Sequence, residues 1–232
     1  MVEGVNLNLN QYTRFMGYPP LSEQIAIHYS PILKHEIQPM TDSIVVPGLK
    51  AAFSIYCNTV LTKGATVVTL EPYNPEFINF LKREGFEVKI IPRNEILESK
   101  DIDETLSKSE LLVLSNAGSD LASPLTPAEL QYLANKVKEH DHLRVFSDES
   151  LHSFCEIDSY TSFSSLPGMS SRVATVFSGD AEFGAEGINI AWIIAKKEEI
   201  YLIGGYQIWT YFSANSVAMV RNIYLMLVVC FK

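Results

Sequence analysis

The chain is poor in cysteine and in clustered basic residues, and each shortage argues against a class of protein. Its cysteines, Cys57, Cys155 and Cys230, are odd in number and widely spaced, so we expect no disulfide framework or zinc site and favour a reducing compartment. The 18 lysines and arginines stand against 27 acidic residues, for a formal net charge of -9, and they form no long basic run. We therefore expect neither nucleic acid nor an anionic membrane as a partner.

Long apolar runs and nucleotide-binding motifs are missing too. The longest late apolar run, Ile223–Phe231, falls short of the ~20 residues that a membrane span needs. The opening MVEGVNLNLNQYTR has neither the apolar core of a signal peptide nor the pattern of a transit peptide, which predicts a cytosolic protein. The sequence contains no GxGxxG, GxxxxGKS/T or GxSxG motif, so nucleotide-binding and nucleophile-elbow hypotheses have no anchor.

Short apolar runs alternate with helix-like stretches along the chain, which is typical of an α/β fold with a mainly parallel sheet and crossover helices. Most strand candidates are continuously rich in Val, Ile and Leu, as expected when helices cover both faces of a seven-stranded sheet in three layers. The predicted strands are Ile44–Val46, Thr66–Leu70, Glu87–Ile91, Leu111–Ser115, Leu143–Ser147, Val173–Phe177 and Ile190–Ala195. The predicted helices are Leu21–Ile37, Leu49–Leu61, Pro75–Glu84, Asp101–Ser107 and Thr126–Glu139.

No internal repeat or obvious linker interrupts this pattern, which predicts one domain. The helix at Thr126 is marked by a capping threonine, a proline at its first position and Glu129 in its first turn. We expect the serine-rich segment Ser159–Ser171 to be a surface loop. Of the histidines, His28 and His35 are expected on the surface of the first helix, and His140 with His142 at a solvated helix end.

Ligands of open α/β sheets bind beyond the carboxyl ends of the strands. Polar or glycine-containing segments follow four strands here, at Pro47–Lys50, Ser115–Asp120, Ser147–Glu149 and Ser178–Ala181. Gly48 precedes a helix, where backbone N–H groups can face a phosphate, although any tight turn between a strand and a helix would also use a glycine. Asp148 could hydrogen-bond a cationic ring nitrogen, or it could cap the next helix, and the pattern alone does not decide between these roles.

The order of these segments resembles a known family. Asn10–Arg14 followed by Gly17–Leu21 is similar to the NQYTRGFGHPRL stretch of kynurenine aminotransferase-like enzymes, which are class I/II aminotransferases. Further segments match in register: Val46–Gly48, Leu70–Tyr73, Ser147–Glu149, Leu166–Met169 and Gly187–Trp192, the last of which resembles GWKIGW. The resemblance extends to about Met219. It implies the large domain of the aspartate-aminotransferase fold and amino-group transfer between an amino acid and a 2-oxo acid through pyridoxal phosphate.

The resemblance also exposes a decisive departure. The family holds its coenzyme as a Schiff base on a lysine three residues after a phosphate-binding serine. Here that serine corresponds to Ser178 and the lysine position to Ala181, and no lysine lies anywhere from Arg172 to Ala195. A methyl group forms no imine and carries no proton, so no catalytic residue is assigned at this position.

Other family positions have changed as well. The second basic phosphate ligand corresponds to Asn189, and the tyrosine that meets the coenzyme's phenolic oxygen corresponds to Leu151. The asparagine that meets the same oxygen corresponds to Asp120. The ring-stacking aromatic corresponds to Asn74, unless a one-residue shift lets Tyr73 serve, and Lys50 stands where the family often has an aromatic near the substrate.

By resemblance, the residues left to contact pyridoxal phosphate are Gly48, Leu49, Asn116, Asp120, Asp148 and Ser178. Without the covalent link and a phosphate cation we expect weak or lost binding. The resemblance assigns residues 1–219 to the large domain, with the small domain absent, and leaves residues 220–232 as an apolar tail. It also implies a homodimer through the large domain. Three hypotheses remain: a non-catalytic aminotransferase-like protein, an active transaminase using another lysine such as Lys50, and a truncated gene-model fragment.

Overall fold

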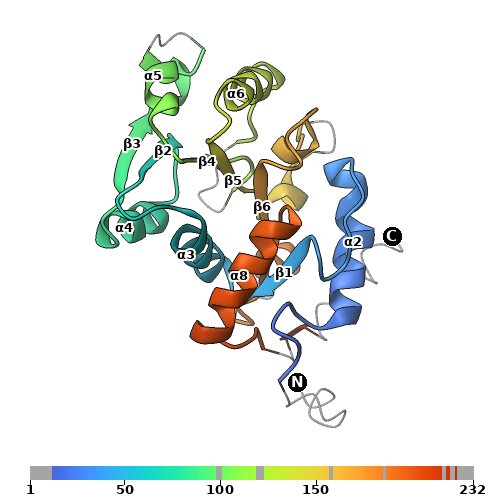
Figure 1. The fold of residues 1–232 in the computed structure, drawn as a ribbon. Helices are drawn as coiled ribbons and strands as arrows, with labels where there is room; N and C mark the ends of the chain where they lie inside the picture. The colour runs from blue at the N-terminus through green and yellow to red at the C-terminus, as the bar shows by residue number, and fades with distance from the viewer. Residues whose placement is uncertain are drawn as a thin grey trace. The chain divides into compact units, whose positions relative to one another are not determined.

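The computed structural model describes residues 12–97, 101–118, 123–156, 159–184, 187–215, 218–219 and 223 (Figure 1). Its strands form a seven-stranded sheet in the order β1-β7-β6-β5-β4-β2-β3. The strands are β1 (Ser43–Val46), β2 (Thr66–Leu70), β3 (Glu87–Ile91), β4 (Leu111–Ser115), β5 (Arg144–Asp148), β6 (Val173–Ser178) and β7 (Ala191–Ile194). Strand β2 pairs in parallel with β3 and β4, and β4 with β5, whereas β1 pairs antiparallel with β7. The prediction of a mostly parallel sheet is confirmed.

Helices separate most of these strands along the chain. They are α2 (Pro19–Leu33), α3 (Leu49–Val60), α4 (Pro75–Arg83), α5 (Asp101–Ser107), α6 (Pro127–Glu139), α7 (Gly179–Glu182) and α8 (Lys197–Thr210). Three short 3-10 turns add η1 (Arg93–Glu95), η2 (His152–Phe154) and η3 (Phe163–Ser165). The described helices include none with the length and apolar character that crossing a membrane would require.

The chain divides into two compact units, with one boundary directly after α3 and the other inside β6. The first unit combines Met1–Val60 with Val176–Lys232, and the second is Leu61–Thr175. Each unit has its own apolar core.

In the second unit, helices cover both faces of the strands. Val145 and Phe146 are successive residues of β5, so their side chains point to opposite faces. Val145 joins a core built with α5 and α6, whereas the Phe146 ring meets Phe77 of α4 edge-on, with the ring centroids 6.1 Å apart. Figure 1 shows α4 on the other side of β2 and β3 from α5 and α6.

In the first unit, too, helices cover both faces of the strands. Val45 of β1 and Trp192 of β7 face α2, whose Tyr29 ring stacks on Phe177 at 4.1 Å between centroids. Their neighbours Ile44 and Ile193 point to the other face and are fully buried as well. Helices α3 and α8, which lie side by side in Figure 1, contact β1 on that side.

The structure differs from the sequence predictions at the end of α2, at α8 and at Ser159–Ser171. Helix α2 ends at Leu33 rather than Ile37, because Lys34 takes a left-handed conformation with φ 56°. Helix α8 was not predicted, because apolar residues lie on both its buried and its exposed side and leave no clear helical period. The Ser159–Ser171 segment is not simply a surface loop, since η3 buries Phe163 and the same segment buries Met169.

Candidate cofactor site

The end of β5 places two adjacent carboxylates inside the second unit. Asp148 is fully buried, and its Oδ1 accepts the backbone N–H of Ser150 at 3.1 Å. This contact closes a turn but caps no helix, because the next helix, η2, has Leu151 at its N-cap and no side-chain cap hydrogen bond. Gly118, in the loop after β4, has no side chain and can therefore lie close to Asp148. A Cβ on Gly118 would stand 3.0 Å from the Asp148 carbonyl oxygen and 3.1 Å from its Cγ. The chain therefore holds a buried carboxylate of fixed orientation at this strand end.

Glu149, which sequence reasoning did not single out, is the centre of a buried hydrogen-bond network. Its carboxylate accepts the hydroxyl of Tyr160, the Ser147 hydroxyl at 2.7 Å and the backbone N–H of Phe163 at 3.1 Å. Burial raises the pKa of Glu149, and these hydrogen bonds only partly oppose that rise. Burial and the neighbouring Glu149 carboxylate also raise the pKa of Tyr160. The network fastens the loop after η2 to the end of β5.

Asn116 is fully buried and makes hydrogen bonds to the chain's own loops. Its Nδ2 donates to the carbonyl of Thr161 at 2.9 Å, and its Oδ1 accepts the N–H of Leu125 at 3.0 Å. Leu151, at the expected tyrosine position, donates its N–H to the Ala117 carbonyl at 2.8 Å, and its side chain has no hydroxyl. Asp120 lies outside the described residues.

Asn74, one of the two residues considered for stacking on the coenzyme ring, has a capping role. Asn74 is the N-cap of α4, where its Oδ1 accepts the N–H of Glu76 at 2.9 Å. Tyr73 instead lines an open cavity of about 520 Å³ together with Pro72 and Arg93. The aromatic side chain facing that hollow is thus Tyr73.

Arg93 holds the rim of this cavity in place. Its Nε and Nη2 donate to the two carboxylate oxygens of Glu129 at 2.7 and 2.8 Å, and its remaining N–H groups reach the carbonyls of Ser123 and Pro124. Glu129 also completes the capping box with Thr126 that the sequence suggested. The guanidinium is therefore committed to the protein rather than to a substrate carboxylate.

This ion pair predicts an acid-dependent loss of stability. Hydrogen bonding to Arg93 lowers the pKa of Glu129 from 4.5 to about 2. A depressed pKa contributes stability that is present above pH ~4.5 and is lost as the pH falls toward ~2, by no more than about 3 kcal/mol. Urea denaturation between pH 6 and pH 2 should show this loss in the wild type and a shallower one in Glu129→Gln. Equal slopes for the two proteins would contradict it.

In the first unit, the position expected for the Schiff-base lysine lies in the short helix α7. Ser178 is its N-cap, and the Ser178 Oγ accepts the N–H of Ala181 at 3.4 Å. Both carboxylate oxygens of Asp180 accept the N–H of Ile190, at 3.0 and 3.1 Å. The helix is thus fastened to β7 around a residue that carries only a methyl group.

Helix α7 is also fastened to α2. The Glu182 side chain, only 4% exposed, accepts the hydroxyl of Tyr29 and lies 3.1 Å from His28 Nε2. The expectation that His28 is a surface residue was wrong, because its side chain is only 16% exposed and meets this carboxylate. The partner is 154 residues away along the chain, so sequence spacing gives no signal for it.

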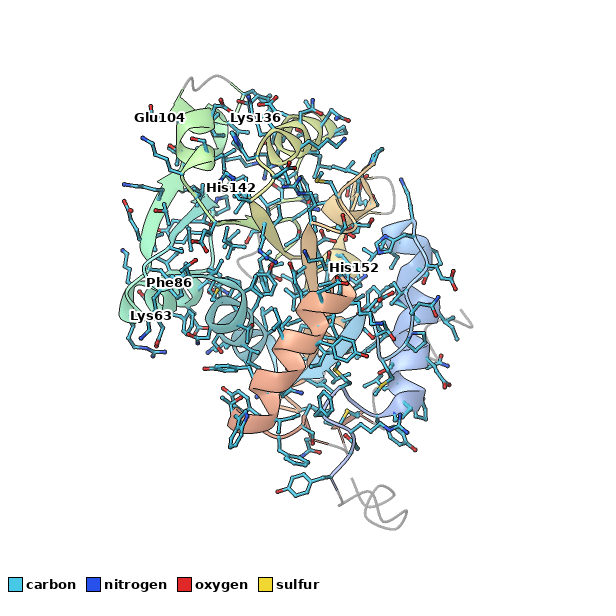
Figure 2. All side chains as sticks on the ribbon, viewed as in Figure 1. Lys63, Phe86, Glu104, Lys136, His142 and His152 are labelled. Carbon is cyan, nitrogen blue, oxygen red and sulfur yellow. The ribbon has the colours of Figure 1, made fainter. Side chains whose placement is uncertain are left out.

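The solvated helix end expected at His140 is likewise wrong for that residue. His140 Nε2 lies 3.1 Å from Asp103 Oδ1, and its side chain is only 14% exposed. Asp103, Glu139 and His140 lie close enough together to suggest a metal site. Lys136 of α6 (Figure 2), however, joins this group through its side chain, with its ammonium 3.0 Å from Asp103 of α5 and 2.7 Å from Glu139 of α6. We therefore interpret this group as an ion-pair cluster that joins the two helices.

Gly48 and Leu49 lie at the start of α3, as predicted. Gly48 has φ +90°, and its carbonyl accepts the Ala52 N–H at 3.0 Å, which opens the helix. The side chain of Asn189 lies directly on Gly48. Its Oδ1 stands 2.0 Å from the point that a Gly48 Cβ would occupy. The turn before α3 is therefore covered by a carboxamide of the chain itself.

Comparison with known proteins decides the family. The model for aminotransferase class I and II matches residues 3–223. The chain belongs to this family. It is 28% identical over 206 residues to kynurenine--oxoglutarate transaminase 1 of Rattus norvegicus, covering 82% of the chain and 48% of the relative. The corresponding protein of Mus musculus is 29% identical over the same length. The chain spans about half the length of these curated relatives.

Solved structures support the aminotransferase fold. The aromatic aminotransferase from Pyrococcus horikoshii OT3 superposes with a TM-score of 0.87 at 23% identity, covering 97% of this chain and 62% of that one. The N-succinyldiaminopimelate aminotransferase from Mycobacterium tuberculosis gives 0.88 at 17% identity, covering 97% and 60%. At these identities the likeness concerns the fold alone.

Aminotransferases of this family generally use pyridoxal phosphate, and the residues at the positions that the resemblance assigns to its attachment do not fit that attachment. Asp148 supplies a buried carboxylate of the kind that a pyridinium nitrogen needs. Ala181 offers no amine for the covalent link, and the Asn189 carboxamide occupies the space over Gly48. Of the predicted contacts, Asn116 and Asp148 lie in the second unit, and Gly48, Leu49 and Ser178 lie in the first.

Proposed function

We propose that this chain is a catalytically impaired member of the aminotransferase family. The observation that carries the proposal is Ala181, a methyl group at the position of the Schiff-base lysine. Transamination needs an amine to hold the coenzyme and to move a proton at the substrate's α-carbon. A methyl group does neither, so we expect no amino transfer between an amino acid and a 2-oxo acid by this chain.

Weak, non-covalent binding of pyridoxal phosphate is the activity that we expect to remain. The buried Asp148 carboxylate favours a cationic ring nitrogen, because a charge-assisted hydrogen bond is stronger than a neutral one. Without the covalent tether, that contact has to hold the ligand largely by itself. The names of the relatives point to kynurenine and oxoglutarate as the first substrates to test.

The runner-up hypothesis is an active transaminase that uses Lys50. This residue is exposed in the first turn of α3, two residues after Gly48. A Schiff-base lysine must reach the coenzyme ring from the side on which the proton is delivered. Nothing in the sequence places the Lys50 amine on that side, so we rank this hypothesis second.

Turnover measurements separate the two hypotheses. The full chain is incubated with saturating pyridoxal phosphate, kynurenine and 2-oxoglutarate, and glutamate formation is followed beside the Lys50→Arg variant. We expect both proteins to match the coenzyme-only background. Activity in the wild type that Lys50→Arg abolishes would overturn the proposal in favour of the runner-up, and activity in both would place the amine elsewhere.

We further propose that residues 1–219 form the family's large domain and that this domain pairs with a second copy through α8. The exposed side of α8 and the turn after it is apolar: Tyr201 52%, Leu202 55%, Ile208 38%, Trp209 91%, Tyr211 48% and Phe212 44% exposed. Together these side chains expose on the order of 600 Å², near the ~800 Å² that each partner buries in a standard interface. Beyond Lys197 and Glu198, which are exposed in the first turn of α8, this side carries no charge, which suits the pairing of two chains that each have a net charge of -9.

Breaking this stripe should leave a monomer. Trp209→Asp places a charge in the apolar interface, so we expect its mass by light scattering to fall from dimer to monomer at micromolar concentration. Phe154→Asp is the matched control, because Phe154 is also an exposed aromatic (70%) but lies in the second unit. A wild type that is monomeric at these concentrations, or a Trp209→Asp variant that stays dimeric, would rule out pairing through α8.

A further inference from the structure

The start of α3 has the form of an anion site. The first backbone N–H groups of a 12-residue helix have no acceptor within the helix itself, and its N-terminus carries a partial positive charge. Gly48, just before that turn, has φ +90°, which side chains rarely allow, and it is buried. A phosphate approaching this turn needs open space over the glycine.

That space is occupied by Asn189. Its Oδ1 and Cγ stand 2.0 and 2.8 Å from the point where a Gly48 Cβ would lie, so the carboxamide is in contact with the glycine backbone. The Asn189 backbone is left-handed, with φ +57°, a conformation that asparagine tolerates better than most residues.

Neighbouring contacts hold the backbone of Asn189 in this place. The next residue, Ile190, is buried in the core, and its N–H is held by both carboxylate oxygens of Asp180. The carbonyl of Ile190 accepts the N–H of Gly179 at 3.1 Å. The Asn189 side chain itself is exposed, so its removal leaves the core unchanged.

We infer that Asn189 blocks the phosphate position at the start of α3 with its own carboxamide. The amide is uncharged, and its oxygen lies nearer to the space over Gly48 than its nitrogen does, at 2.0 Å against 3.4 Å from the point that a Cβ would occupy. A phosphate therefore has to displace a built-in acceptor and gains no cation from this residue. This inference deepens the proposed function: the chain has lost phosphate recognition as well as the covalent link, and the two losses are independent.

The test measures phosphate binding directly. Inorganic phosphate is titrated into the wild type and into Asn189→Gly, with binding followed by 31P NMR line broadening. Glycine adopts φ +57° freely, so this variant keeps the backbone while it opens the space. We expect Asn189→Gly to bind phosphate roughly two- to fivefold more tightly, the typical scale of an anion at a helix N-terminus. The same variant should also gain affinity for pyridoxal phosphate but not for pyridoxal.

Two further variants make the result decisive. Asn189→Asp keeps the size of the side chain and adds a negative charge, so it should bind phosphate no better than the wild type. Asn189→Ala removes the carboxamide with a different backbone preference, and we expect the same gain as for glycine. Phosphate binding by the wild type equal to that of both Asn189→Gly and Asn189→Ala would overturn the inference. Turnover of kynurenine by the wild type would overturn the proposed function without altering this comparison.

Discussion

With lysine introduced at position 181, the chain should capture pyridoxal phosphate covalently. We expect Ala181→Lys to develop the visible absorption band of a lysine-bound coenzyme. After borohydride reduction it should carry one added coenzyme per chain, on the peptide that contains residue 181. The physical reason is that α7 is already ordered by Ser178 and Asp180, so the new amine starts from a fixed backbone. The wild type should show no such adduct.

The matched control for this variant is Ala181→Arg. Arginine has a similar reach and a permanent charge but forms no stable imine, so it separates covalent capture from simple attraction of the phosphate. We expect no transamination by Ala181→Lys, because Asn189 and Leu151 stand at the positions that the resemblance assigns to a phosphate cation and a tyrosine. A folded Ala181→Lys protein without the band, or one with full turnover, would show that the site has been misinterpreted.

Glu149→Ala should strongly destabilise the second unit. It removes the acceptor for the Tyr160 hydroxyl, the Ser147 hydroxyl and the Phe163 N–H, all at a fully buried position. Each buried donor left without a partner costs roughly 1–3 kcal/mol, so the free energy of unfolding should fall by about 3–5 kcal/mol. Equilibrium urea denaturation measures this directly.

Glu156→Ala is the control for this change, because Glu156 is an exposed glutamate of the same unit. Its stability should stay within about 0.5 kcal/mol of the wild type. Glu149→Gln adds a test with a definite sign. Because the folded pKa of Glu149 is raised, its contribution is full below the unfolded pKa and is lost as the pH rises through the folded value. The glutamine variant should lack this decline, and similar losses of stability in Glu149→Ala and Glu156→Ala would refute the role of the network.

The sheet could be predicted because its signals are local. Continuous apolar runs such as Leu111–Ser115, bounded by polar and glycine residues, give strands directly, and β2, β3 and β4 have the predicted bounds. The capping box is a local signal as well, because it needs only Thr126 and Glu129, three residues apart. Helix α8 escaped prediction because its exposed side is as apolar as its buried side, so the period that marks a surface helix is lost.

The contacts of the candidate site depend on partners that sequence spacing does not reveal. The amide of Asn116 donates to the carbonyl of Thr161, 45 residues further on, and its predicted contact with a cofactor stays a prediction. Glu182 meets Tyr29 across 153 residues, and Asn189 reaches back to Gly48. The assignment of the Schiff-base position to Ala181 needs only the register of a resemblance and no tertiary contact, so it could be predicted from the sequence, and it stays a prediction.

The mass of the intact wild-type chain after reduction with borohydride in saturating pyridoxal phosphate tests the absence of that amine most directly. We predict the mass of the unmodified chain, apart from scattered substoichiometric labelling of surface lysines, under conditions in which Ala181→Lys gains one coenzyme per chain. A saturable, stoichiometric adduct on one lysine of the wild type, Lys50 or any other, would contradict the proposal that this aminotransferase chain has lost its catalytic amine.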